Sequence, residues 1–185
     1  MNRLHHWYCA RPGWSRYVRE ELVPGTIADT DLGEDVLEVG PGPGRTTDVL
    51  APLVDRLTVL EIDAAFAQPL EVRFAGTSVA VRQGDASLMP FADDSFSAVV
   101  CFTMLHHVPT SQLQDRIFAE ARRVLRPGGV FIGSDSVGRS LGFRFLHVRD
   151  TKTVLDPSTL PDRLHSAGFE KAEVRVDPPI RFRAT

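Results

Sequence analysis

The chain has 185 residues, of which 43% are hydrophobic and 24% are charged, and its formal net charge is −3. These values are typical of one globular domain, and they exclude the strongly basic field of a general nucleic-acid binder. Cys9 and Cys101 lie far apart without metal-ligand spacing, so we expect neither a metal site nor a disulfide framework. The sequence lacks a signal-like start and a long apolar run, which predicts a cytoplasmic protein without a membrane span.

Strands and helices are expected to alternate along most of the chain. An amphipathic helix is predicted over 15–23 and should end at Pro24-Gly25. Strands are then expected at 35–39, 57–62, 79–83, 96–102 and 130–134, with helices at 46–51, 64–74, 111–125 and 158–167. Two alternating segments, 172–176 and 180–184, flank Asp177-Pro178-Pro179 as in a hairpin. This pattern predicts a mostly parallel α/β sheet with helices on both faces and an antiparallel edge.

The carboxyl ends of the predicted strands carry most of the candidate polar residues. In open α/β sheets, ligands bind outside these ends, near the point where the strand order reverses. Residues 38–40, Glu61, Asp85, 102–107 and 134–136 all lie at or just after predicted strand ends. We therefore place the functional site along this edge.

A glycine loop, VGPGPGRTT, follows the first predicted strand. Glycine removes the Cβ and lets a ligand approach the backbone closely. The dinucleotide fingerprint G-x-G-x-x-G would place its third glycine where Arg45 stands, whereas Gly40, Gly42 and Gly44 alternate. The pattern E-x-G-x-G-x-G, starting at Glu38, resembles the first motif of class I S-adenosylmethionine-dependent methyltransferases. A purely structural glycine turn is the alternative interpretation.

Two acidic residues near the loop bear on the type of ligand. Glu38 would repel a pyrophosphate but could hold an ammonium group, directly or through water. Glu61 ends the second predicted strand, where a carboxylate can accept hydrogen bonds from both ribose hydroxyls. Asp63 is a competing candidate, although its place before AAFAQ favours a helix cap.

The third predicted strand ends in QGDA. Asp85 and Ala86 resemble the methyltransferase element that meets adenine, in which a carboxylate binds the exocyclic amine and the next amide a ring nitrogen. The alternative is that Asp85 only shapes a turn after Gly84. The apolar residues Leu60, Ile62, Leu88 and Met89 could flank the adenine ring or belong to the core. We expect Ile62 to contact the cofactor, together with Phe102 at the end of the fourth strand.

The segments PFADDSFSAVVCFTMLHHVP and LRPGGVFIGSD extend the resemblance to residues 34–135. They are similar to the small-molecule branch of the superfamily, which includes the ubiquinone and menaquinone biosynthesis type. Ser97 departs from this branch, which usually has aspartate there. The resemblance implies a Rossmann-like seven-stranded sheet in the order 3-2-1-4-5-7-6 with the last strand antiparallel. It also implies S-adenosylmethionine as cofactor and S-adenosylhomocysteine as product.

The acceptor is expected to be a small molecule, not a nucleic acid. Amino-methyltransferases of nucleic acids carry an N/D-x/P-P-aromatic motif after the fourth strand, whereas Phe102-Thr103-Met104-Leu105 stands here. His106 and His107 occupy that strand end, and either could act as a general base. The alternative is that one of them merely binds the backbone or lies against the adenosine.

The expected domain spans 1–185: a helical cap (1–33), a cofactor core (34–135), a lid (136–155) and a C-terminal helix and hairpin (156–185). Acceptor-side candidates in the cap and lid are Trp7, Tyr8, Phe143, Phe145 and His147. The oligomeric state is not determined by the sequence. A binding or regulatory protein without turnover and a nicotinamide-dependent oxidoreductase remain as alternatives, the latter disfavoured by Glu38 and the early third glycine.

Overall fold

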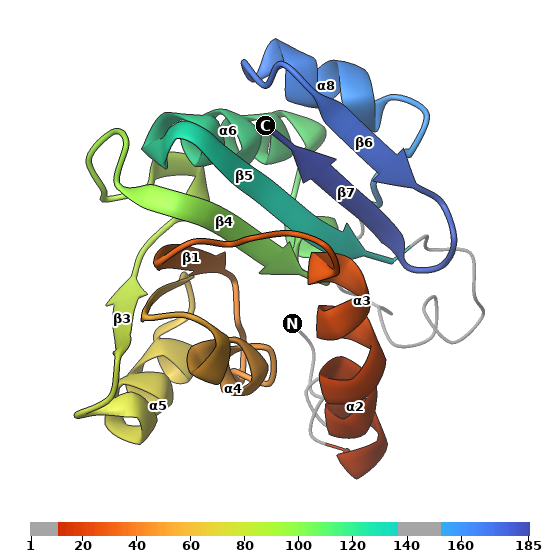
Figure 1. The fold of residues 1–185 in the computed structure, drawn as a ribbon. Coiled ribbons are helices and arrows are strands. Elements are labelled where there is room, and N and C mark those ends of the chain that lie inside the picture. The colour runs from red at the N-terminus through yellow and green to blue at the C-terminus, as the bar shows by residue number, and fades with distance from the viewer. Residues whose placement is uncertain (1–10, 137–152) are drawn as a thin grey trace.

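The computed structural model describes residues 11–136 and 153–185 (Figure 1). Its sheet has seven strands in the order β3-β2-β1-β4-β5-β7-β6, which confirms the expected order. The strands are β1 (Asp35–Val39), β2 (Arg56–Glu61), β3 (Val79–Gln83), β4 (Phe96–Phe102), β5 (Leu125–Asp135), β6 (Ala172–Arg175) and β7 (Ile180–Ala184). Neighbours among β1 to β5 are parallel, whereas β7 is antiparallel to both β5 and β6.

Helices cover both faces of this sheet. One face is covered by α6 (Ser111–Val124) and α8 (Leu160–Ser166), and the other by α4 (Thr47–Leu50), α5 (Ala64–Phe74) and the N-terminal helices (Figure 1). The remaining helical turns are η2 (Ala51–Leu53), η3 (Ala86–Leu88) and η4 (Leu105–His107). Among the helices that the structure describes, none is both long and apolar enough to cross a membrane.

Each face of the sheet has its own apolar core, because successive strand residues point to opposite sides. Val36 belongs to the cluster that contains Leu50 of α4 and Leu70 of α5. Leu37 belongs to the other cluster, which contains Phe118 of α6. Four of the five β1 residues and six of the seven β4 residues are buried, as expected for central strands covered on both faces.

The first helix does not end at Pro24-Gly25 as predicted. It continues from α2 (Pro12–Tyr17) through η1 (Val18–Leu22) into α3 (Val23–Ile27). In η1 the amide of Val23 donates to the carbonyl of Val18, five residues back, which is a π-type turn. This wider turn comes immediately before Pro24, which lies in the first turn of α3, where its missing N–H costs little.

The strand predicted at 130–134 is longer, because β5 begins at Leu125, directly after α6. Leu125 pairs with Phe96, and a register shift between Phe96 and Ala98 absorbs the Pro-Gly-Gly segment. Gly128 has a φ of +78° there, a conformation that glycine adopts without strain. Pro127-Gly128-Gly129 therefore lies within an irregular strand and does not separate a helix from a later strand.

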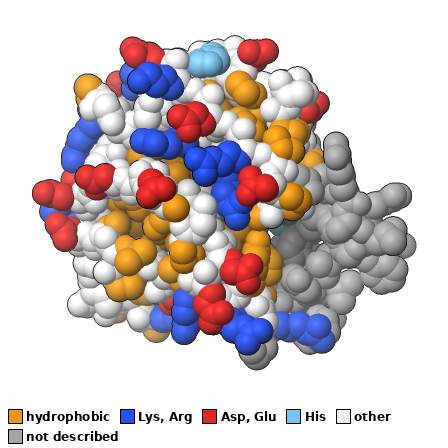
Figure 2. All heavy atoms as spheres, turned by 45° about the vertical axis from the view of Figure 1, so that its right-hand side comes forward, with side chains coloured by type: hydrophobic (Ala, Val, Ile, Leu, Met, Phe, Trp, Pro, Cys, Tyr) orange, Lys and Arg blue, Asp and Glu red, His pale blue; other side chains and the backbone are white. Residues whose placement is uncertain are grey.

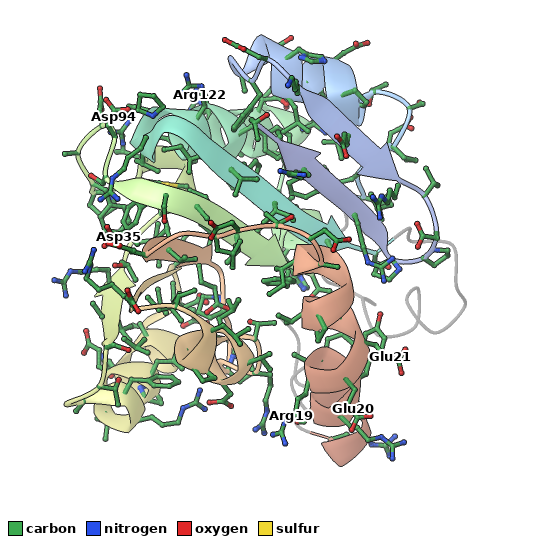
Figure 3. The ribbon with its side chains drawn as sticks, in the orientation of Figure 1. Arg19, Glu20, Glu21, Asp35, Asp94 and Arg122 are labelled. Carbon is green, nitrogen blue, oxygen red and sulfur yellow. The ribbon has the colours of Figure 1, made fainter. Side chains whose placement is uncertain are left out.

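A surface ion network is centred on Asp35, which lies at the amino end of β1 (Figure 3). The Asp35 carboxylate accepts hydrogen bonds from Arg56 at 2.9 Å and from Arg126 at 2.7 Å. Ser97, which departs from the family pattern, donates its hydroxyl to the carbonyls of Leu32 and Asp35 and accepts the Asp35 amide. Ser97 thus holds the backbone at the start of β1 in place. This role is structural, because the amino ends of the strands lie opposite to the candidate site.

Candidate active site

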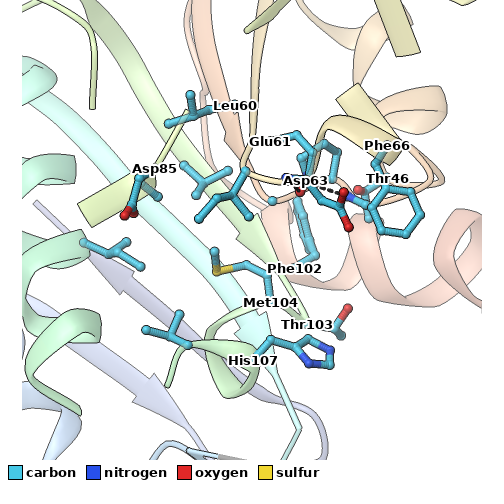
Figure 4. Close-up of a pocket in the computed structure, with 18 of the residues that line it drawn as sticks. Thr46, Leu60, Glu61, Asp63, Phe66, Asp85, Phe102, Thr103, Met104 and His107 are labelled. Carbon is cyan, nitrogen blue, oxygen red and sulfur yellow. Dashed lines mark hydrogen bonds between the residues drawn. The ribbon is translucent and has the colours of Figure 1, made fainter. Parts of the chain in front are cut away.

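A cavity of about 410 Å³ lies at the carboxyl ends of β1 to β4 (Figure 4). The glycine loop, the ends of β2 and β3, the segment after β4 and the helical residues Trp14 and Val18 all contribute to its wall. The predicted site residues that line it are Gly40, Gly42, Glu61, Ile62, Asp85, Ala86, Phe102 and His107. The edge predicted from the sequence is therefore where the cavity lies.

The three loop glycines have positive φ angles of +66°, +53° and +78°, but for different reasons. A Cβ on Gly44 would come within 2.5 Å of Leu70 and would also strike Arg73, both on α5. A Cβ on Gly40 would crowd Met104 at 3.1 Å. A Cβ on Gly42 would meet nothing within 4 Å. Gly44 is thus required for packing, whereas Gly42 leaves open space in the wall of the cavity.

Glu38 does not line the cavity. Its side chain is buried behind the glycine loop, where the hydroxyls of Thr46 and Thr47 donate to its two carboxylate oxygens, the latter at 2.6 Å. Burial raises the pKa of the Glu38 carboxyl to about 7, against the effect of these two hydrogen bonds. This arrangement does not favour the expected direct contact between the Glu38 carboxylate and a ligand's ammonium group. Glu38 instead fixes the start of α4 through Thr46 and Thr47.

Glu61 ties the end of β2 to the glycine loop. Its carboxylate accepts the amide of Gly42 at 2.9 Å and the amide of Asp63 at 2.9 Å. Burial raises the pKa of the Glu61 carboxyl, and the backbone hydrogen bonds oppose this rise. Asp63 accepts the amide of Ala65 at 2.9 Å and caps α5, as predicted, although it also borders the cavity.

Asp85 follows β3 and is exposed in the cavity wall next to Ala86. One of its oxygens accepts the Ser87 amide at 2.8 Å, so Asp85 also caps the turn η3. Asp85 therefore shapes the turn, as the alternative interpretation expected, and it also borders the cavity. Among the apolar candidates, Ile62 lines the cavity with 64% of its surface exposed, whereas Leu88 and Met89 do not line it.

The structure separates the two histidines. His107 lines the cavity, whereas His106 does not and is only 3% exposed. The His106 ring contacts the fully buried carboxylate of Asp135 through Nδ1, and the His106 amide donates to the same carboxylate at 3.1 Å. His106 is therefore an internal anchor, and of the two only His107 is placed to contact a ligand.

The turn that carries both histidines is held from further directions. Gln114 of α6, which is fully buried, donates to the carbonyl of Leu105 at 2.9 Å and to that of Thr153 at 2.7 Å. The Thr153 amide donates to the carbonyl of His106 at 3.0 Å. These contacts, together with Asp135, fix the backbone immediately before His107.

The matches with known proteins agree with this geometry. The sequence profile of a family described as "Methyltransferase domain" matches residues 37–133, just over half of the chain. The chain belongs to the class I S-adenosylmethionine-dependent methyltransferases.

Three matches show how far the likeness extends. A probable S-adenosylmethionine-dependent methyltransferase of Mycolicibacterium smegmatis is 34% identical over 163 residues, which cover 85% of this chain and 59% of that protein. An uncharacterized methyltransferase of Bacillus subtilis is 30% identical over 183 residues, covering 89% and 70%. A methyltransferase solved in complex with the Haloferax volcanii activator Trm112 has a TM-score of 0.78 at 15% identity, covers 100% and 98%, and shows the fold alone. The chain thus spans about three fifths of the first relative.

The cavity of this methyltransferase fits the cofactor of its family. S-adenosylmethionine combines adenosine with an amino-acid end and carries no phosphate. Glu61 and Asp85 supply carboxylates at the ends of β2 and β3, and Gly42 leaves the loop open where a ligand must approach the backbone. Carboxylates would repel the phosphates of a dinucleotide but can accept hydrogen bonds from hydroxyls and amines.

Sequence reasoning missed several residues of the methyltransferase cavity. Trp14 and Val18 reach it from the N-terminal helices, Arg45 from the loop and Thr103 from the end of β4. Thr103 has a φ of +50°, which is uncommon outside glycine and typical of functional sites. Of these, Arg45 could have been singled out from the sequence, because it stands where the dinucleotide fingerprint has its third glycine. The acceptor candidates Trp7, Tyr8, Phe143, Phe145 and His147 lie outside the described residues.

Proposed function

We propose that this chain transfers a methyl group from S-adenosylmethionine to a small-molecule acceptor. The observation that carries the proposal is the shared cavity. Glu61, Asp85 and the glycine loop line it on one side, and His107 lines it at the end of β4. Binding groups for a nucleoside and a side chain able to take a proton therefore face the same space.

In the proposed binding mode, the cofactor follows the strand ends in the order β3, β2, β1. Asp85 and Ala86 bind the adenine, with Ile62 against its face. Glu61 accepts hydrogen bonds from the ribose hydroxyls. Gly40 and Gly42 allow the backbone to approach the rest of the cofactor, while Phe102 closes the wall beneath it. Glu38 acts indirectly, because it fixes the loop through Thr46 and Thr47.

The bound cofactor supplies an activated methyl group on a sulfonium. The chain's own residues then have to align the acceptor with this methyl group and exclude water, and such positioning can contribute up to ~7–11 kcal/mol. The apolar wall formed by Trp14, Val18 and Phe102 serves water exclusion. If the acceptor atom is protonated, His107 takes the proton as the displacement proceeds.

A small acceptor is favoured by size and charge. A cavity of about 410 Å³ is in the range of small-ligand sites. The net charge is −3, and on the face shown in Figure 2 basic and acidic side chains are interspersed, with no continuous basic field. Relatives with shorter matches point to different acceptors: one is named a fatty-acid O-methyltransferase and another a ribosomal RNA small subunit methyltransferase A.

The proposal is tested by methyl transfer itself. The protein is incubated with S-adenosylmethionine carrying a labelled methyl group and with panels of phenols, quinols, amines and carboxylates, with structured RNA as a parallel acceptor. Label on a small molecule, dependent on His107, supports the proposal. Label on RNA alone contradicts the acceptor class. Tight S-adenosylhomocysteine binding with no transfer to any acceptor favours the alternative function, a nucleoside-binding protein without turnover.

A further inference from the structure

Arg45 is an unusual member of the cavity wall. Among the cavity-lining residues that the structure describes, it is the only arginine or lysine, and it faces a space bordered by Glu61, Asp63 and Asp85. Its Nε atom is buried and has no hydrogen-bond partner within the described parts of the chain. A buried donor on a charged group that stays unpaired costs free energy, on the order of 1–3 kcal/mol or more. The arrangement therefore calls for an acceptor supplied from outside.

The acidic residues near Arg45 already have other partners. Glu38 accepts the hydroxyls of Thr46 and Thr47, and Glu61 accepts two backbone amides. Asp48 forms an ion pair with Arg73 at 3.2 Å. Arg73 also donates to the carbonyls of Pro43 and Gly44, so this arginine supports the loop from outside. Within the described residues the Arg45 guanidinium pairs with none of these carboxylates, and its Nε edge is available to a ligand.

The position of Arg45 along the cavity identifies which part of a ligand it meets. Asp85 follows β3, Glu61 ends β2 and the loop follows β1, and these three strands are neighbours in that order. Figure 4 shows Asp85 and Thr46, the neighbour of Arg45, on opposite sides of the cavity with Glu61 between them. A ligand with adenine at Asp85 and ribose at Glu61 therefore extends its remaining end toward Arg45.

We propose that Arg45 binds the carboxylate of the cofactor's amino-acid end. This inference rests on the proposed function, since it assumes S-adenosylmethionine in the cavity. Arginine and carboxylate commonly pair through two parallel hydrogen bonds, and a pair that uses Nε together with one terminal nitrogen would satisfy the buried donor. Arg45 thereby selects for a cofactor with an intact amino-acid end.

The first experiment compares two ligands by calorimetric titration. S-adenosylhomocysteine has the amino-acid end, and 5′-methylthioadenosine lacks it. In Arg45→Met, which keeps an apolar stem of similar reach, we expect S-adenosylhomocysteine affinity to fall about 10-fold to 100-fold, the range for hydrogen bonds to charged groups. Affinity for 5′-methylthioadenosine should stay within about twofold, and this unchanged binding also shows that the variant is folded.

Two further variants separate charge from geometry. Arg45→Lys keeps the charge but loses the planar fork, so it should recover only part of the affinity. Arg19→Met removes the same charge from the exposed surface of η1 (Figure 3) and should leave both affinities unchanged. Equal losses in Arg45→Met and Arg19→Met would overturn the inference, because they would reflect net charge alone.

A carboxylate could also come from the acceptor, and a second arm distinguishes the two sources. Octanoate and octanol are titrated into protein saturated with S-adenosylhomocysteine. Unchanged octanoate binding in Arg45→Met supports the assignment to the cofactor. A loss confined to octanoate, with S-adenosylhomocysteine affinity intact, would overturn it in favour of the acceptor. Equal loss for both nucleosides overturns the inference but not the proposed function, whereas wild-type protein that binds neither overturns both.

Discussion

The buried ring of His106 contacts the buried carboxylate of Asp135, one residue before His107 reaches the cavity. Asp135 ends β5 and also accepts the amides of His106 and Ser136, the latter at 2.6 Å. This carboxylate therefore joins the ends of two neighbouring strands at the site. Two adjacent histidines consequently have different roles: one holds the turn, and the other faces the ligand.

Replacement of His107 should reduce turnover more than cofactor binding. We expect His107→Asn to lower kcat at least about 100-fold if the acceptor atom must lose a proton, since general bases contribute this much. The affinity for S-adenosylhomocysteine should change less than about threefold. Steady-state kinetics and calorimetry on the same preparation test this split, and an unchanged kcat would show that His107 is not a base.

His106→Leu should behave differently, because it leaves the Asp135 carboxylate buried with one partner fewer. An unpaired buried polar group costs about 1–3 kcal/mol, and more when it is charged. We expect a lower free energy of unfolding in urea, with a larger loss than in His107→Asn. Equal stability of the two variants would contradict the anchor role of His106.

The loop glycines should separate binding from folding. In Gly42→Ala the new methyl group meets open space, so the folded chain should lose only about 1 kcal/mol from the positive φ, whereas cofactor affinity should fall strongly. In Gly44→Ala the methyl group strikes α5, and the melting temperature should drop well below that of Gly42→Ala. Thermal unfolding and S-adenosylhomocysteine titration are measured on both. A fully functional Gly42→Ala would place the ligand elsewhere.

Glu38 should make stability depend on pH. Its carboxyl has a pKa of about 7 in the folded chain and near 4.5 when unfolded, so the folded state binds more protons between these values. The free energy of unfolding should therefore be highest below about pH 4.5 on this account and decline as pH rises toward 7, by at most about 1.4 kcal/mol per pH unit. Glu61, whose pKa is also raised, acts in the same direction.

Glu38→Gln keeps the shape of the side chain but cannot titrate, so the decline in this window should become shallower. Urea unfolding at several pH values measures it. The same slope in wild type and Glu38→Gln would mean that other groups cause the pH dependence.

Glu61→Gln tests the ribose contact. The amide retains one oxygen for the backbone but loses the second acceptor and the charge, so S-adenosylhomocysteine affinity should fall about tenfold or more. Asp63→Asn is the matched control, because Asp63 caps α5 and should mainly affect stability. A larger affinity loss in Asp63→Asn than in Glu61→Gln would show that Asp63, and not Glu61, contacts the ribose.

Much of this architecture follows from local patterns. The apolar strands and the hairpin were predictable because the burial of a strand and the residues of a turn leave a pattern within a few neighbouring residues. The boundary of β5 was not, because its pairing with Phe96 depends on a partner distant in sequence. The first helix passes Pro24 because a wide turn forms just before it, which no periodicity signals.

The lining of the cavity was predictable where a motif fixes the backbone, as at Gly42, Glu61 and Asp85. The surroundings of Glu38, His106 and Arg45 were not predictable, because they depend on which groups tertiary packing places beside each side chain. Asp135 lies 29 residues from His106 along the chain, yet this contact decides which histidine faces the cavity.

Calorimetric titration of the wild-type protein with S-adenosylhomocysteine and with NAD tests the central claim most directly. If adenosine lies at Asp85 and Glu61 with the amino-acid end beyond the glycine loop, S-adenosylhomocysteine should bind at one site per chain. NAD should bind much more weakly, because the carboxylates in the cavity wall repel its pyrophosphate. Tight NAD binding together with no heat from S-adenosylhomocysteine would contradict the account.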